Sequence, residues 1–201
     1  MKKYISFLPV LLLVSFIALP TELSRKEKKF AVSYLEETRD DLFNTVAGLT
    51  EDQFNFKPSD DRWSIRECIQ HIALSEVNMR QMLDASLNQP ANPEKKGEIK
   101  ATDEQLIKMF SDRSNKFKAP ETFQPVKSTF STATDALANF KMNREKLVKF
   151  IKNTKVDLRS HILQSPGGMV DSYQWVLAIS AHSNRHTQQA AEVKADPNFP
   201  K

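Results

Sequence analysis

The chain has 201 residues, enough for one domain with a full hydrophobic core but short for two. Hydrophobic residues make up 40% and charged residues 27%, an ordinary globular composition, and only 4 glycines argue against a turn-rich β-sandwich. The formal net charge of +4 comes from basic residues spread along the chain, so we expect no nucleic-acid partner.

The N-terminus has the layout of a secretory signal. Lys2 and Lys3 precede an apolar run from Tyr4 to Leu19, which is shorter than the roughly 20 residues that a spanning helix needs. We therefore predict that residues 1–20 are an export signal and that the protein is periplasmic or extracellular. The segment Ala18-Leu19-Pro20 is a poor cleavage site, so an uncleaved membrane anchor is the alternative. Residues 21–201 are predicted to form one helical-bundle domain.

Two long helices are expected in the first half of this domain. Apolar residues at three- and four-residue steps predict the first helix over residues 24–49. Residues 50–63 read as a connector. Ser64, with Glu67 three residues later, then makes the capping box that opens the second helix, which reaches about Asn88.

The second half repeats this alternation of loops and helices. A loop over residues 89–100 leads to a short helix from Thr102 to about Lys116, and a third long helix is expected over residues 132–153. Residues 154–170 read as a loop, after which Asp171 caps the last helix. No strand is expected. The predicted fold is all-α, a four-helix bundle with a short inserted helix between the second and third long helices.

Two histidines occupy an unusual place in the last helix. Because His182 and His186 are four residues apart, they fall with Trp175, Ile179 and Val193 within roughly 60° of one another on the helical wheel. Both imidazoles therefore lie on the face that should be buried. A buried polar ring without a partner costs about 1–3 kcal/mol, so a shared divalent metal ion is the natural partner for the pair.

A third histidine, His71, lies at the flank of the buried face of the second helix, where its side chain can reach a crevice between helices. The stretches WSIRECIQHIALSE (63–76) and AHSNRHTQQAAEVK (181–194) resemble the DinB/YfiT-like superfamily. The resemblance covers nearly all of residues 24–194. It implies a four-helix bundle in which His71, His182 and His186 bind a divalent metal ion.

The chemistry of imidazole agrees with this implication. Neutral imidazole is a good ligand for zinc or nickel, the two ions that we expect first, with iron, manganese and copper left open. Three histidines leave a coordination position free for water or substrate, as in catalytic rather than structural zinc sites. Their lack of charge favours an anionic further ligand.

The resemblance also implies an activity. We predict a metal-dependent enzyme whose three-histidine site activates water, as a hydrolase, or a small-molecule thiol, as an S-transferase. The alternative is an exported bundle that binds a metal or a ligand without catalysis. The expected partner is a small-molecule substrate, with no membrane contact beyond the N-terminal segment, and a homodimer is left open.

Four other residues were weighed as contributors to the site. Glu76 and Gln188 are candidates for orienting the ligands, since metal-bound histidines usually donate their second N–H. Cys68 lies on the buried stripe and is expected to be a core residue rather than a ligand. His161, in the loop before the last helix, is expected to be a surface histidine.

Overall fold

The computed structural model describes residues 22–114 and 123–201. The predicted export segment, residues 1–20, lies outside the described residues. Four long helices dominate the molecule, α1 (Arg25–Val46), α3 (Ile65–Leu87), α5 (Ala133–Asn153) and α6 (Ser172–Lys194). The predicted all-α four-helix bundle is confirmed.

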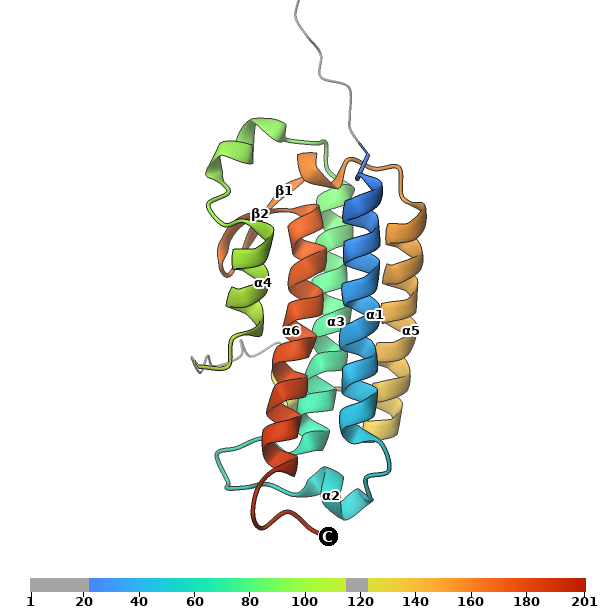
Figure 1. Ribbon diagram of the computed structural model, residues 1–201, viewed down its shortest axis with the longest axis vertical. Coiled ribbons are helices and arrows are strands. Elements are labelled where there is room, and N and C mark those ends of the chain that lie inside the picture. Colours follow the sequence, from blue (N-terminus) through green and yellow to red (C-terminus); the bar gives the residue numbers. More distant parts are fainter. Residues whose placement is uncertain (1–21, 115–122) are drawn as a thin grey trace, which may run out of the picture.

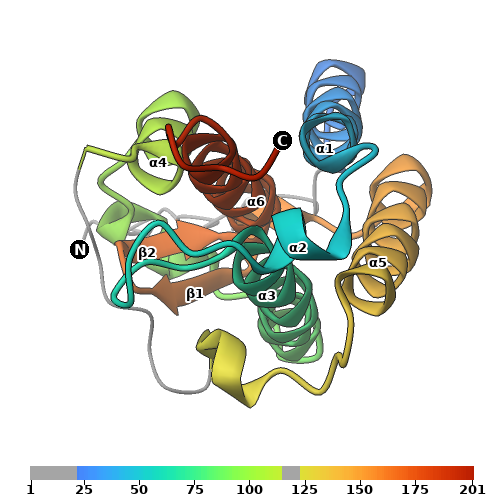
Figure 2. The ribbon, with the colours of Figure 1, turned by 90° about the horizontal axis from the view of Figure 1, so that it is seen from below.

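The order of the helices around the bundle differs from their order in the chain. α1 contacts α5 and α6, and α3 contacts the same two helices, so the ring runs α1, α5, α3, α6 (Figures 1 and 2). Colours in Figure 1 show that α1 and α6 run in one direction and that α3 and α5 run in the other. α3 and α6 are therefore antiparallel neighbours, although more than 80 residues separate them in the sequence.

A short helix, α4 (Asp103–Ser111), is inserted between α3 and α5 and packs on the outside of α6 (Figure 2). It ends earlier than the expected Lys116, which lies outside the described residues. The connector after α1 also contains a short helix, α2 (Glu51–Asn55), that the periodicity did not predict. Short 3-10 helices among the described residues are η1 (Pro93–Glu98), η3 (Pro125–Lys127) and η4 (Leu158–Ser160).

The expectation of no strands is wrong at one place. Residues 154–170 were expected to be a loop, but β1 (Ile162–Ser165) and β2 (Gly168–Asp171) form an antiparallel hairpin that pairs Ile162 with Asp171 and Ser165 with Gly168. A distant residue, Asn92, also hydrogen-bonds the first strand of this hairpin. The side-chain amide of Asn92 accepts a hydrogen bond from the Ile162 N–H at 2.7 Å and donates one to its carbonyl at 3.0 Å.

Helix starts follow the sequence closely. Ser64 and Glu67 at the start of α3 form the predicted capping box, as do Thr102 and Gln105 at the start of α4. Asp171 caps α6, accepting a 2.7 Å hydrogen bond from the Gln174 N–H. Each cap satisfies backbone N–H groups that the first turn of a helix otherwise leaves without partners.

The most deeply buried element is α6. Residues 171–180 are buried without exception, because α1, α3 and α4 surround the first half of this helix. Two apolar clusters fill the interior. One lies around Leu35, Met79 and Trp175, and the other around Leu42 and Phe140. Within the described residues, no helix has both the length and the apolar character needed to cross a membrane.

Candidate metal centre

The fold brings the three predicted histidines together. His71 comes from the first half of α3, and His182 and His186 come from the middle of the antiparallel α6. The Nε2 atom of His71 lies 3.2 Å from that of His182 and 3.1 Å from that of His186. Among the residues that the structure describes, this is the one cluster of histidine, cysteine or carboxylate side chains placed to share a metal ion.

Hydrogen bonds at Nδ1 of His71 and of His186 determine which ring nitrogen of each carries the proton. The Nδ1–H of His71 donates a hydrogen bond to the carbonyl of Phe123, and the Nδ1–H of His186 donates to Oε1 of Gln189 at 2.9 Å. Both acceptors need a proton on Nδ1, so both Nε2 atoms present lone pairs to the centre. Lone pairs at this separation repel each other, and a cation between them removes that repulsion.

The spacing of the nitrogens fits a transition-metal ion. Nitrogen ligands at about 2.0–2.1 Å from zinc lie about 2.9 Å apart at right angles and about 3.3 Å apart in a tetrahedron. The observed separations of 3.1 and 3.2 Å fall between these limits. All three ligand atoms lie within 4.8 Å of one another, and the spacing from His71 to the other two rings suits a divalent ion.

Burial keeps the imidazoles in the neutral form that a metal ion needs. His71 is 2% exposed and His186 is 7% exposed, whereas His182 is half-buried. Burial lowers the pKa of His71 to about 4. The pKa values of His182 and His186 are also well below the ordinary value, because of burial first and the neighbouring imidazoles second. All three rings are therefore uncharged at neutral pH.

An aromatic ring covers one side of the cluster. The indole of Trp63 lies 4.9 Å from the ring of His71 and stacks at 5.7 Å, with an interplanar angle of 28°, on the ring of His186. Trp63 directly precedes Ser64, so the N-cap of α3 also fixes the position of the indole. The indole shields the two rings from water on that side.

Two expectations about neighbouring residues are wrong. Glu76 does not orient a histidine, since its carboxylate pairs with Arg144. Gln188 hydrogen-bonds Asn184 and the carbonyl of Ser111, and the next residue, Gln189, contacts His186 instead. The signal was present in the sequence, because a residue three positions after His186 shares its helix face and a residue two positions after it does not.

The remaining two candidates stand apart from the centre. Cys68 is fully buried in the apolar core, as expected, and burial raises the pKa of its thiol. His161 is half-buried rather than on the surface, at the start of the hairpin, where its Nδ1 lies 3.2 Å from the carbonyl of Ser86. Neither side chain belongs to the histidine cluster.

A buried ion pair, which the sequence did not predict, lies close to the centre. Arg144 on α5 has no exposed surface. Its Nε and Nη2 donate to the two carboxylate oxygens of Glu76 on α3 at 2.7 and 2.8 Å. Its Nη1 donates to the carbonyl of Leu35 and to Oγ1 of Thr38 on α1, at 3.0 and 2.7 Å, and its Nη2 also donates to Oγ of Ser183 on α6 at 2.9 Å. One guanidinium thus contacts all three other long helices.

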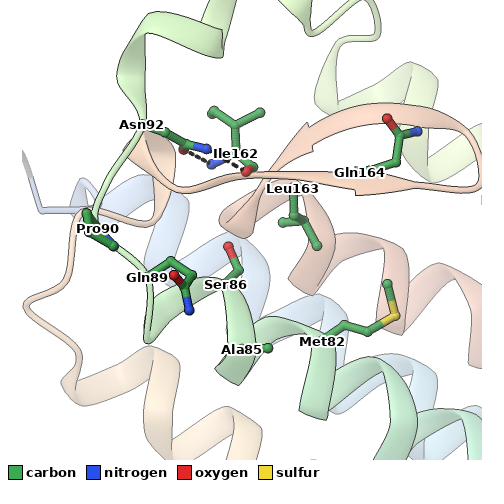
Figure 3. A pocket seen from close by; sticks show the side chains of 9 residues that line it. All are labelled: Met82, Ala85, Ser86, Gln89, Pro90, Asn92, Ile162, Leu163 and Gln164. Atoms are coloured by element: carbon green, nitrogen blue, oxygen red, sulfur yellow. Dashed lines mark hydrogen bonds between the residues drawn. The ribbon is translucent and has the colours of Figure 1, made fainter.

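A surface groove lies at the other end of α3. It has a volume of about 440 Å³ and lies between the end of α3 and β1 (Figure 3). Its lining consists of Met82, Ala85, Ser86, Gln89, Pro90, Asn92, Ile162, Leu163 and Gln164. None of these side chains is a metal ligand of the histidine or carboxylate type. Met82 is also about 16 Å along the helix axis from His71, so the groove is separate from the histidine cluster.

Comparisons with known proteins agree with this geometry. The uncharacterized protein YuaE of Bacillus subtilis (strain 168) is 29% identical over 164 residues, which cover 81% of this chain and 96% of that protein. YfiT from Bacillus subtilis, described as a probable metal-dependent hydrolase with an unusual four-helix bundle topology, has a similar structure with a TM-score of 0.60. The two structures share 16% sequence identity, over 89% of this chain and 91% of YfiT, so the similarity concerns the fold.

The family model of the DinB superfamily matches residues 34–190, from the third turn of α1 to the last turns of α6. This range contains all three histidines of the cluster and the helices that carry them. The chain belongs to the DinB superfamily.

Proposed function

We propose that this protein is a metal-dependent enzyme that binds a divalent cation through Nε2 of His71, His182 and His186. The observation that carries the proposal is the convergence of three neutral ring nitrogens, with separations of 3.1 and 3.2 Å that suit one ion. The description of YfiT as a probable metal-dependent hydrolase supports the same assignment.

The protein residues prepare the site in three ways. Gln189 and the carbonyl of Phe123 hold two rings in the tautomer that directs Nε2 to the centre. Burial keeps the rings unprotonated, and the indole of Trp63 limits the access of water from one side. A bound divalent ion would act as a Lewis acid that lowers the pKa of a water or a thiol.

We propose hydrolysis of a small molecule as the leading reaction, since this is the activity named for YfiT. S-transfer from a small-molecule thiol is the second candidate. One observation favours it. Within residues 22–114 and 123–201 the cluster contains no carboxylate that could act as a base for water. A thiol whose pKa is lowered by a bound metal ion would release its proton to solvent at neutral pH and would need no such base.

Metal analysis tests the site directly. We expect protein purified without an affinity tag to hold one divalent ion per chain, with zinc or nickel as the first expectation. His186→Ala should lose that ion, whereas His161→Ala, a histidine outside the cluster, should keep it. Stoichiometric metal that persists unchanged in His186→Ala would overturn the proposed ligand set.

A substrate screen separates an enzyme from an exported binding protein without catalysis. Ester, amide and electrophile–thiol substrates should be tested with the metal-loaded protein. Activity that disappears with a chelator and returns with added zinc or nickel supports catalysis. If no substrate turns over while the metal raises the unfolding temperature strongly, the non-catalytic alternative is favoured.

Export is proposed on the basis of residues 1–20 alone. Fractionation of cells that produce the full chain should place the protein in the periplasm or the medium. A chain that lacks residues 1–20 should remain in the cytoplasm. Equal distribution of both chains would contradict the proposal.

A further inference from the structure

We propose that Arg144 is a positioning residue for the three-histidine site, and this inference rests on the proposed metal function. Arg144 lies on α5, and within the described part of the chain its hydrogen bonds go to Glu76, Leu35, Thr38 and Ser183 rather than to an imidazole. It acts through its partners on α3 and α6, the two helices that carry the ring nitrogens. Its role is to set how α6 lies against α3.

The contacts of Arg144 are close to the ligands along both helices. Glu76 follows His71 by five residues, about 7.5 Å along α3, and Ser183 is the residue directly after His182. A single guanidinium nitrogen, Nη2, bonds both Glu76 and Ser183. A slide or rotation of one helix against the other would therefore break this junction before it moved the histidines far apart.

The hydrogen bonds of the guanidinium specify one arrangement. Arginine has five N–H donors, and each of the five has an acceptor here, two on Glu76 and one each on Leu35, Thr38 and Ser183. All of these groups are buried. Any change in helix register would leave a buried donor without an acceptor, so the network accepts one register and opposes the others.

The place of this network in the core supports the assignment. Its side chains form a polar layer between the two apolar clusters. Along α1, α3 and α5 the layer residues Thr38, Glu76 and Arg144 each lie between a residue of one cluster and a residue of the other. Apolar side chains alone tolerate small sliding movements, because their contacts have no direction. The hydrogen bonds of the polar layer are directional, so they fix the relative positions of the helices beside the histidine cluster.

A double substitution separates positioning from general stability. In Glu76→Leu/Arg144→Met both charges are replaced by apolar side chains, a change that often leaves stability unaltered or raises it. We expect the metal-free variant to unfold near the wild-type midpoint in urea. Cobalt(II) chloride titrated into it should bind at least tenfold more weakly than to wild type, with an altered visible absorption spectrum. Wild-type affinity and spectrum in a folded double variant would overturn the proposal.

A matched pair of single substitutions decides the question even if the double variant does not fold. Ser183→Ala removes the acceptor on α6 from this guanidinium. Thr38→Val removes an acceptor on α1 from the same guanidinium, together with the 2.8 Å hydrogen bond between Oγ1 of Thr38 and Oγ of Ser180. We expect similar losses of stability from both, but a weaker and spectrally altered cobalt site only in Ser183→Ala. Equal cobalt binding in the two variants would refute the positioning role. Wild-type protein that binds no cobalt would instead refute the metal function itself.

Discussion

At the scale of single residues, the candidate site depends on the hydrogen bonds that two of its imidazoles make through Nδ1, the ring nitrogen that faces away from the centre. Metal-bound histidines usually donate their second ring N–H to an acceptor, which holds the ring with Nε2 toward the ion. Gln189 provides that acceptor for His186 from one turn further along α6, and a backbone carbonyl provides it for His71. The ligands are thus held by groups that would not themselves touch the ion.

Gln189→Leu should weaken metal binding without unfolding the protein. Loss of the 2.9 Å hydrogen bond frees the ring of His186 to rotate, and loss of such a partner typically costs about 10- to 100-fold in metal affinity. Gln188→Leu is the matched control, because Gln188 is exposed and bonds Asn184 and the Ser111 carbonyl instead. Competition with a chelating dye measures both affinities. Equal affinities would show that Gln189 has no orienting role.

Ser75→Ala should leave the protein as stable as before or more stable. The hydroxyl of Ser75 is buried, and within the described residues it has no hydrogen-bond partner. A buried polar group without a partner costs about 1–3 kcal/mol, so its removal should raise the free energy of unfolding by up to that amount. Urea denaturation measures the change. A clear loss of stability would mean that the hydroxyl has a partner, such as a bound water.

The three histidines could be found from the sequence because their pattern is local or carried by the family resemblance. Spacing places His182 and His186 on one buried face, and the resemblance adds His71. Burial of Arg144 could not be found in this way. Charged residues in helices usually face solvent, and its carboxylate partner is 68 residues away. Only the packed bundle brings the two together.

At the scale of elements, the sequence predicts the long helices well because their signals are local. Ser64, Thr102 and Asp171 mark the N-termini of α3, α4 and α6, and each cap accepts the predicted hydrogen bond. The hairpin was missed because its strands have only four residues each and the edge of β1 is completed by the side chain of Asn92. Asn92 is 70 residues away from Ile162, so this contact cannot be predicted from the sequence pattern around the strands.

The turn of this hairpin gives a prediction about glycine. Gly168 has a φ angle of +112°, a conformation that side chains with a β carbon rarely adopt. Gly168→Ala should therefore lower the free energy of unfolding by roughly 1–3 kcal/mol. Gly97→Ala is the control, because an added methyl group there meets no atom within 4 Å and the φ angle is not positive. Urea unfolding of both variants checks the difference, and equal stabilities would contradict it.

At the scale of the whole molecule, the bundle closes around a polar layer rather than a continuous apolar core. Four helices contribute to this layer, and the histidine cluster lies beside it. Metal binding should therefore add to the stability of the entire domain, since the ligands come from two helices that are far apart in the chain.

Metal-free protein should lose stability steeply as the pH falls. In the unfolded chain the imidazoles take up protons below about pH 6.5, whereas burial holds the pKa of His71 at about 4 and those of His182 and His186 well below the ordinary value. The folded pKa values are lowered, so their stabilising contribution is complete above pH 6.5 and is lost as the pH falls. Each ring should contribute a slope of about 1.4 kcal/mol per pH unit between pH 6 and pH 5.

Urea unfolding in the presence of a chelator at several pH values measures this slope. His182→Ala removes one of the three rings and should reduce the slope by about one third. His161→Ala should not change the part of the slope of unfolding free energy against pH that comes from the cluster. A slope that does not change when His182 is removed would show that the buried rings do not control the acid sensitivity.

The position of α6 has a consequence for the order of events in the cell. This helix is the last of the four long helices to leave the ribosome, and two of the three nitrogens lie near its middle. The cluster cannot form until α6 has emerged from the ribosome and has docked against α3. A chain exported before folding would acquire its ion only at its destination, so the ion supply of that compartment, as much as the ligand set, would decide which element the mature protein carries.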